Sequence, residues 1–231
     1  MIRTRDDDAV RVVTIDRPAR RNALRTEELT ALRTAVADAD APVTYLRGAG
    51  EAFCAGADLD AVAALDDPES FARAGQRTAA TIADAETVVV CGIDGAARGG
   101  GVELALAADL RVATPAATFA EPGVAFGLFG AWGGTVRLPR VMGEGDALDF
   151  ALSGRVLDAD EALRTGLVSR VVDDPRSVAD AIATGKPDAL SAIKRRMRDR
   201  RDDETQERAE AAAFADLVRA HADDIAATRG E

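Results

Sequence analysis

Cysteine, lysine, histidine and aromatic residues are all scarce in this chain of 231 residues. Its two cysteines, Cys54 and Cys91, are too few for a disulfide framework or a cysteine-based zinc site. Aromatic residues make up only 4 % against a hydrophobic fraction of 47 %, so a core must consist mainly of aliphatic side chains and alanine. No apolar run is long enough to span a bilayer and no signal peptide follows Met1, so we expect a cytoplasmic protein.

Positive charge is also in short supply. The chain has 40 acidic and 29 basic residues, which gives a net charge of −11. A surface with this balance repels nucleic acids and anionic membranes, so we expect neither as a partner. Any phosphate-bearing ligand would need a local basic patch within this negative field.

Strand and helix patterns alternate along most of the chain. Val10–Ile15, Val43–Leu46 and Thr87–Ile93 are apolar runs typical of strands. Thr87–Ile93 shows no alternation of apolar and polar residues, which indicates a strand covered on both faces. Thr26–Val36 and Phe71–Ala85 have the apolar spacing of helices. This alternation predicts α/β packing.

The last quarter of the chain has a different pattern. Asp158, followed three residues later by Glu161, is expected to cap a short helix that ends near Gly166. After residue 176 only helical spacing remains. We therefore predict an α/β core over residues 1–176 and a helical C-terminal subdomain over residues 177–231.

Two glycine-rich segments each follow a predicted strand and precede a helix. They are residues 54–59, Cys-Ala-Gly-Ala-Asp-Leu, and residues 99–105, Gly-Gly-Gly-Val-Glu-Leu-Ala. Glycines in such a turn let a ligand approach backbone N–H groups, and a helix start adds unpaired donors and partial positive charge. Such a site suits an oxyanion. Either segment alone, however, is explained as readily by a tight turn.

Taken in order, the two segments resemble the two signatures of the enoyl-CoA hydratase/isomerase, or crotonase, family. The first signature corresponds to residues 53–59 and the second to residues 95–105. Further matches lie at residues 109–113, 133–140, 152–155, 160–163 and 166–168. The resemblance runs from about Val10 to Val172 and implies a crotonase-like ββα spiral core, followed here by the helical C-terminal region.

The resemblance also implies roles for individual residues. The N–H groups of Ala57 and Gly100 would form an oxyanion hole for the thioester oxygen of an acyl-CoA, and Glu103 corresponds to the first catalytic glutamate. From its position alone, Glu103 is better explained as a first-turn acid that interacts favourably with the helix dipole. The residues expected around the substrate and its CoA are Ala55, Asp58, Leu59, Gly99, Trp132 and Gly133. Asp58 could instead serve only as a helix cap.

The second glutamate of the family is missing from its usual position. The family segment Phe-Gly-Gln-Pro-Glu-Val reads Phe-Ala-Glu-Pro-Gly-Val here, so Gly123 stands at the glutamate position and Glu121 lies two residues earlier. In an extended segment residues two apart point the same way, and Glu121 could substitute from a backbone position displaced by about 6.6 Å. The alternative is that Glu121 is a loop acid.

These observations predict chemistry on an acyl-CoA, with hydration of a 2-enoyl-CoA as the leading function. Three alternatives stay open. They are double-bond isomerisation, some other reaction of the family that needs only one carboxylate, and acyl-CoA binding without catalysis. Trp132 replaces a small residue of the family, and its ring could narrow the acyl pocket, exclude water or simply pack against a helix. The resemblance implies no metal or redox cofactor, because coenzyme A enters with the substrate. It further implies a homotrimer or hexamer.

Overall fold

The computed structural model describes residues 1–227, which form two compact units. The first unit comprises Met1–Ala183 and the second begins at Thr184. No helix within these residues combines the length and the apolar character needed to cross a membrane.

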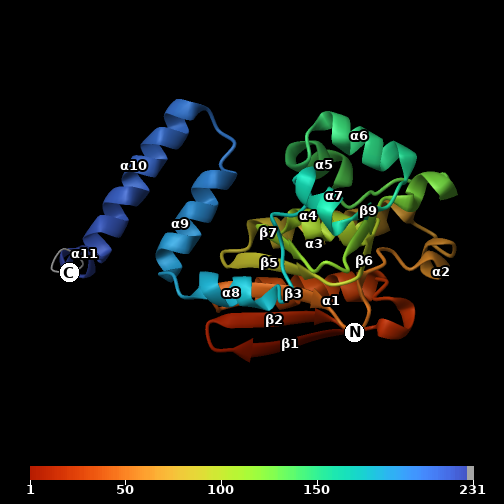
Figure 1. Ribbon diagram of the computed structural model, residues 1–231, viewed down its shortest axis with the longest axis horizontal. Coiled ribbons are helices and arrows are strands. Elements are labelled where there is room, and N and C mark those ends of the chain that lie inside the picture. The colour runs from red at the N-terminus through yellow and green to blue at the C-terminus, as the bar shows by residue number, and fades with distance from the viewer. Residues whose placement is uncertain (228–231) are drawn as a thin grey trace. The chain divides into compact units, whose positions relative to one another are not determined.

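A six-stranded sheet forms one layer of the first unit (Figure 1). In spatial order its strands are β1 (Ile2–Asp7), β2 (Val10–Ile15), β3 (Val43–Gly48), β5 (Val88–Ile93), β7 (Leu110–Ala113) and β10 (Arg170–Val171). All neighbours are parallel except β1 and β2, which are antiparallel. Every residue of β5 is buried, as its unbroken apolar run predicts for a central strand.

A smaller sheet of four short strands lies beside it. Its strands, in spatial order, are β4 (Ala52–Cys54), β6 (Ala96–Arg98), β8 (Thr118–Ala120) and β9 (Leu157–Asp158). Successive strands alternate between the two sheets, so that β3 leads to β4, β5 to β6 and β7 to β8. Because β4, β6 and β8 are parallel, their carboxyl ends meet at one edge, and the segments that follow them lie together.

Helices connect the strands and cover the sheets. In chain order they are the 3-10 helix η1 (Pro18–Arg20), α1 (Thr26–Ala37), α2 (Leu59–Val62), α3 (Pro68–Asp84), α4 (Gly100–Ala107), the 3-10 helix η2 (Pro122–Phe126), α5 (Gly134–Val141), α6 (Glu144–Ser153), α7 (Ala159–Arg164) and α8 (Arg176–Ala183). Helix α3 packs between α1 and α4. The predicted capping box of α7 is confirmed, since the N–H of Glu161 donates to Asp158 at 2.8 Å.

The core of the first unit is aliphatic, as the scarcity of aromatic residues predicts. Leu29 and Leu32 of α1 pack with Val89 of β5 in one buried cluster. Phe53 and Phe119, among its few aromatic residues, are fully buried in the short strands β4 and β8. The elements that lead into the glycine-rich segments are therefore anchored in the core.

Over residues 184–227 the second unit contains the helices α9 (Pro187–Arg198), α10 (Asp203–Ala220) and α11 (Ala222–Ala227). Helix α10 packs against α9 and α11. We placed the start of the helical subdomain at residue 177, whereas the first unit extends to Ala183. The reason is that α8 packs against β2, β3 and β5 and is thus part of the α/β core.

Candidate active site

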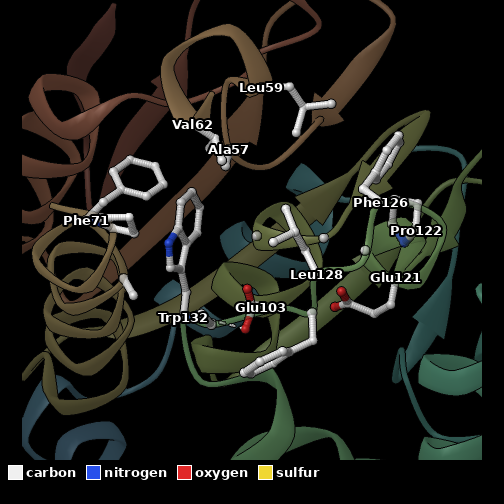
Figure 2. Close-up of a pocket in the computed structure, with 18 of the residues that line it drawn as sticks. Ala57, Leu59, Val62, Phe71, Glu103, Glu121, Pro122, Phe126, Leu128 and Trp132 are labelled. Atoms are coloured by element: carbon white, nitrogen blue, oxygen red, sulfur yellow. Dashed lines mark hydrogen bonds between the residues drawn. The ribbon is translucent and has the colours of Figure 1, made fainter. Parts of the chain in front are cut away.

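A cavity of about 330 Å³ lies at the edge where β4, β6 and β8 end (Figure 2). The segment after β4 contributes Ala55, Ala57 and Leu59 to its wall, and Gly99 and Gly100 follow β6. The residue after β8 is Glu121, which also lines the cavity together with Glu103 and Trp132. Eight of the ten residues proposed for the site from the sequence thus surround one space.

Two backbone N–H groups at the cavity wall have no protein partner. These groups belong to Ala57 and Gly100, and within residues 1–227 neither donates to a protein acceptor. The two loops that carry them lie in close contact: a Cβ on Gly56 would lie 2.8 Å from the nitrogen of Gly100, and a Cβ on Gly101 would lie 2.2 Å from the carbonyl oxygen of Cys54. Only glycine permits this approach, which brings the two free donors to the same cavity.

Glu103 lies in the first turn of α4 with only 1 % of its surface exposed. Its Oε1 accepts hydrogen bonds from the N–H groups of Trp132 at 2.8 Å and Gly134 at 2.6 Å. Burial raises the pKa of Glu103 to about 7, because desolvation outweighs the two backbone donors that favour the anion. Glu103 can therefore exchange a proton near neutral pH.

Glu121 is the second carboxyl group in the cavity and is 5 % exposed. Its Oε1 has no hydrogen-bond partner among residues 1–227. Burial, together with the smaller effect of the negative charge of Glu103, raises the pKa of Glu121 to about 8. Near neutral pH, Glu121 thus retains its proton more readily than Glu103 does.

The backbone at Glu121 differs from the extended segment that we assumed. Strand β8 ends at Ala120, and Glu121 is the N-cap of the 3-10 helix η2, which begins at Pro122. The extended backbone expected over positions 121–123 is therefore wrong, because the chain enters a 3-10 helix at Pro122. Glu121 still lines the cavity because it directly follows β8, whose Ala120 accepts a 2.9 Å hydrogen bond from the N–H of Gly99.

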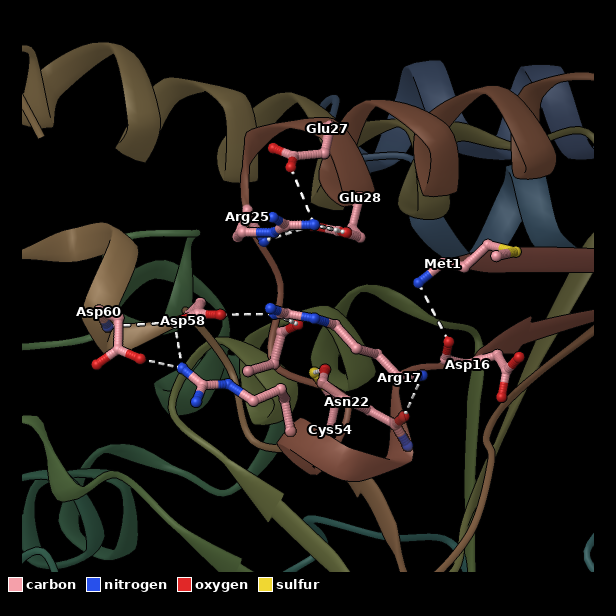
Figure 3. Close-up of polar contacts among 12 residues, drawn as sticks. Met1, Asp16, Arg17, Asn22, Arg25, Glu27, Glu28, Cys54, Asp58 and Asp60 are labelled. Atoms are coloured by element: carbon pink, nitrogen blue, oxygen red, sulfur yellow. Dashed lines mark hydrogen bonds and ion pairs between the residues drawn. The ribbon is translucent and has the colours of Figure 1, made fainter. Parts of the chain in front are cut away.

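The remaining two proposed residues, Asp58 and Gly133, lie behind the cavity wall. Asp58 accepts a 2.6 Å hydrogen bond from Nη1 of Arg17 and a 3.1 Å hydrogen bond from the N–H of Asp60 at the start of α2 (Figure 3). The hydrogen bond from Arg17 is the main reason that the pKa of Asp58 is lowered. Gly133 is the N-cap of α5. Both residues support the segments that form the site.

Several residues of the site were not identified from the sequence. The N–H groups of Trp132 and Gly134 hold Glu103, a role that no pattern in the sequence indicates. Apolar side chains that complete the cavity wall are Val62, Leu65, Phe71, Pro122, Phe126, Leu128 and Phe129. They come from α2, α3 and η2 and from the loops that follow α2 and η2, and no local pattern in the sequence links them.

The arrangement combines three chemical features in one space. Free N–H groups at Ala57 and Gly100 can bind an oxygen that gains negative charge. Glu103 and Glu121 can accept and donate protons, and the apolar wall keeps the site poorly solvated. Among residues 1–227, no group of three or more His, Cys, Asp or Glu side chains converges to hold a metal ion.

Comparisons with known proteins show extensive similarity. The family model described as "Enoyl-CoA hydratase/isomerase" matches residues 5–224. The "Probable enoyl-CoA hydratase echA8" of Mycobacterium bovis is 36 % identical over 184 residues, which cover 77 % of this chain and 72 % of that protein. The short-chain-enoyl-CoA hydratase of Clostridium acetobutylicum is 34 % identical over 198 residues, which cover 80 % of this chain and 76 % of that protein.

Solved structures give the same result for the fold. The enoyl-CoA hydratase from Bacillus anthracis superposes with a TM-score of 0.87 and 29 % identity, over 94 % of this chain and 91 % of that one. This similarity confirms the α/β, crotonase-like fold that was predicted from the two glycine-rich signatures.

Proposed function

This chain belongs to the enoyl-CoA hydratase/isomerase family, and from that premise we propose that it adds water across the double bond of a 2-enoyl-CoA thioester. One observation carries the proposal. Two buried carboxyl groups, Glu103 and Glu121, enter the same apolar cavity beside the free N–H groups of Ala57 and Gly100. A hydratase needs this combination, because one carboxylate must take a proton from water while another acid supplies one to carbon.

The two N–H groups act on the thioester oxygen. When a nucleophile adds to Cβ of the enoyl group, the electrons of the double bond move toward the carbonyl and the oxygen becomes negative. Hydrogen bonds from Ala57 and Gly100 stabilise this enolate more than the neutral ester, and each donor of this kind contributes about 3 kcal/mol. Free donors at the cavity wall support this role.

The two carboxyl groups have different roles in the proposed reaction. Glu103 takes a proton from a water molecule as the water oxygen bonds to Cβ, and Glu121 gives its own proton to Cα. The product is a 3-hydroxyacyl-CoA. The two hydrogen bonds to Glu103 favour its anion, whereas Oε1 of Glu121 has no partner among the described residues and Glu121 has the higher pKa. These steps need only protein groups, water and the thioester, with coenzyme A as part of the substrate.

We also propose that the protein functions as a homo-oligomer, a trimer or a hexamer. Large apolar side chains are exposed on η2, on the loop that follows it and on α6. Contact between subunits would remove this apolar surface from water, which favours association. They are Val124, Phe126, Leu128, Phe129, Leu148 and Leu152. Light scattering coupled to size-exclusion chromatography measures the assembly, and a monomer at micromolar concentration would contradict this part of the proposal.

The experiment that tests the function follows the loss of the enoyl thioester absorbance with crotonyl-CoA as substrate. We expect turnover in the wild type and a loss of about 10²- to 10⁴-fold in kcat for Glu103→Gln and for Glu121→Gln. Glu144→Gln, at an exposed acid of α6, is the matched control and should retain full activity. The same assays with a 3-enoyl-CoA detect isomerisation.

The outcomes separate the alternatives. Loss of activity in Glu103→Gln with full activity in Glu121→Gln would remove Glu121 from the mechanism. Turnover of the 3-enoyl-CoA alone would replace hydration by isomerisation. Binding of CoA esters with turnover of neither substrate would contradict an enzymatic role.

A further inference from the structure

The indole of Trp132 fills the space between helix α3 and the start of α4. The side chain is only 3 % exposed, and its ring meets that of Phe71 edge to face with centroids 5.8 Å apart. Figure 2 shows the indole beside Phe71 at the wall of the cavity, on the side away from Glu121. The ring therefore occupies the space between α3 and the start of α4 at the wall of the cavity.

Two glycines provide the room for this ring. A Cβ on Gly75 would lie 2.0 Å from Cδ1 of Trp132, and a Cβ on Gly100 would lie 2.2 Å from its Cζ3. Gly75 is in the interior of α3, where glycine is among the least favourable residues. The absence of a side chain on both flanks of the indole indicates that the ring has a fixed position, since any other residue at either flank would displace it.

The position of the ring has a consequence for the acyl chain. Gly100 is one of the two proposed donors to the thioester oxygen, so the first carbons of a bound acyl group must lie close to the benzene edge of the indole. The chain cannot continue between α3 and α4, because the ring occupies that path. The cavity that remains, about 330 Å³, is at the small end of the range for ligand pockets.

We infer that Trp132 sets the length of the acyl group and restricts the substrate to short-chain CoA thioesters. This inference rests on the proposed function, since it assumes that the thioester carbonyl binds at Ala57 and Gly100. Trp132 would thus determine specificity through its side chain while its backbone N–H holds Glu103.

Binding of saturated acyl-CoA esters tests the inference without depending on chemistry. Isothermal titration calorimetry with butanoyl-CoA and decanoyl-CoA gives the length preference as the ratio of the two dissociation constants. We expect the wild type to bind butanoyl-CoA at least about tenfold more tightly, because the ring blocks the path of the longer chain, which can bind only by displacing packed groups. Trp132→Ala should bind decanoyl-CoA at least about tenfold more tightly than the wild type does.

Two further variants make the test independent of a folding defect. Trp132→Phe keeps an aromatic contact with Phe71 and should shift the ratio in the same direction by a smaller amount. Leu163→Ala removes an exposed apolar side chain of α7, away from the cavity wall and from the apolar patch on η2 and α6, and should leave the ratio unchanged. Thermal melting of each variant establishes that it is folded before the titration.

The results distinguish this inference from the proposed function. If folded Trp132→Ala and Trp132→Phe both keep the wild-type ratio, or if the wild type binds decanoyl-CoA as tightly as butanoyl-CoA, the inference is overturned while the proposed function stands. If no CoA ester binds at any chain length, the proposed function fails, and the inference fails with it.

Discussion

Glu103 and Trp132 are 29 residues apart in the sequence, yet the N–H of Trp132 donates a 2.8 Å hydrogen bond to Oε1 of Glu103. Two residues further on, Gly134 donates to the same oxygen at 2.6 Å. The loop that presents the indole to the cavity thereby also fixes the carboxylate. In the part of the chain that the structure describes, Oε1 of Glu121 has no such contact, so two buried acids in one cavity have different proton affinities.

This asymmetry predicts a bell-shaped pH dependence of hydratase activity. Glu103 must be deprotonated to accept a proton, so kcat/KM should rise as the pH increases through about 7. Glu121 must be protonated to donate, so kcat/KM should fall as the pH increases through about 8. Initial rates with crotonyl-CoA between about pH 5.5 and 9.5 measure both limbs.

The control for this prediction is Glu121→Gln, which cannot lose a proton. Its residual activity should lack the decrease on the alkaline side and keep the increase on the acidic side. A profile of unchanged shape in this variant would contradict the assignment of Glu121 as the proton donor.

A second prediction concerns Gly123, at the position of the second glutamate in the family. The chain reverses direction there, and the N–H of Leu128 donates to the carbonyl of Gly123 at 2.9 Å. A Cβ on Gly123 would lie 2.9 Å from the carbonyl oxygen of Leu128 and 3.0 Å from Cα of Phe129, both backbone atoms. Gly123→Glu should therefore lower the free energy of unfolding by about 1–3 kcal/mol, as overpacking does.

The same geometry predicts that a glutamate at position 123 does not replace Glu121. The double variant Glu121→Gln/Gly123→Glu should be as inactive with crotonyl-CoA as Glu121→Gln alone. Gly145→Glu is the matched control, because a Cβ on Gly145 meets no atom within 4 Å, and its unfolding in urea should resemble that of the wild type. Recovery of activity in the double variant would show that the loop accepts the family arrangement.

The sequence predicted the strands and helices that a few neighbouring residues identify. Strand β5 was predicted because its apolar run is unbroken, and the helix after Asp158 because cap and partner are three residues apart. Strand β1 was not predicted, because its charged residues lie at an exposed edge where pairing with β2 stabilises them. Helix α5 was also missed, since Pro139 and flanking glycines are typical of loops.

In the site, too, the residues in local motifs were predicted and the contacts between distant segments were not. Glu103 and Glu121 could be selected from motifs, although the turn that brings Glu121 to the cavity was not foreseen. The donors at Trp132 and Gly134 and the fit of the indole against Gly75 depend on contacts between segments far apart in the chain. Such contacts follow from tertiary packing, for which neither composition nor periodicity gives a signal.

A third prediction concerns the ion pair next to Ala57, the proposed oxyanion donor. The side chain of Asp58 is 3 % exposed and accepts from Arg17 at 2.6 Å. Asp58→Asn keeps the shape but removes the charge, which should lower the free energy of unfolding by about 2 kcal/mol. Because Ala57 directly precedes Asp58, KM for crotonyl-CoA should rise as well. Urea unfolding and steady-state kinetics measure the two effects.

Asp60→Asn provides the control for this pair and should change the free energy of unfolding little, because Asp60 is 80 % exposed and its contact with Arg20 lies in solvent.

The free energy of unfolding that Asp58 contributes depends on pH. The pKa of Asp58 is lowered, so its stabilisation is present above the ordinary carboxyl pKa and is lost as the pH falls. Asp58→Asn should therefore lose less stability than the wild type on acidification, and an equal loss would contradict the prediction.

The last prediction concerns Asn22, a fully buried residue with a left-handed φ of 61°. Its amide nitrogen donates to the carbonyls of Ala49 at 2.9 Å and Ala52 at 2.7 Å, and its oxygen accepts from the N–H of Arg17 at 2.9 Å. Asn22 thereby joins the loop after β2 to the segment that leads into the cavity. Asn22→Ala should destabilise the protein by about 3 kcal/mol, because buried backbone groups lose their partners.

Comparison with Asn22→Gly separates the hydrogen bonds from the backbone conformation. Both variants lose the amide, but only alanine also has the steric penalty of the left-handed region, about 1 kcal/mol. Asn22→Gly should therefore be the more stable variant in urea unfolding. Position 80 in helix α3 is the control. There the wild-type alanine should be more stable than the variant Ala80→Gly, since glycine is about 1 kcal/mol less favourable than alanine inside a helix. If Asn22→Ala were instead more stable than Asn22→Gly, the left-handed backbone would have to relax when the amide is removed, and the loop would owe its shape to the hydrogen bonds alone.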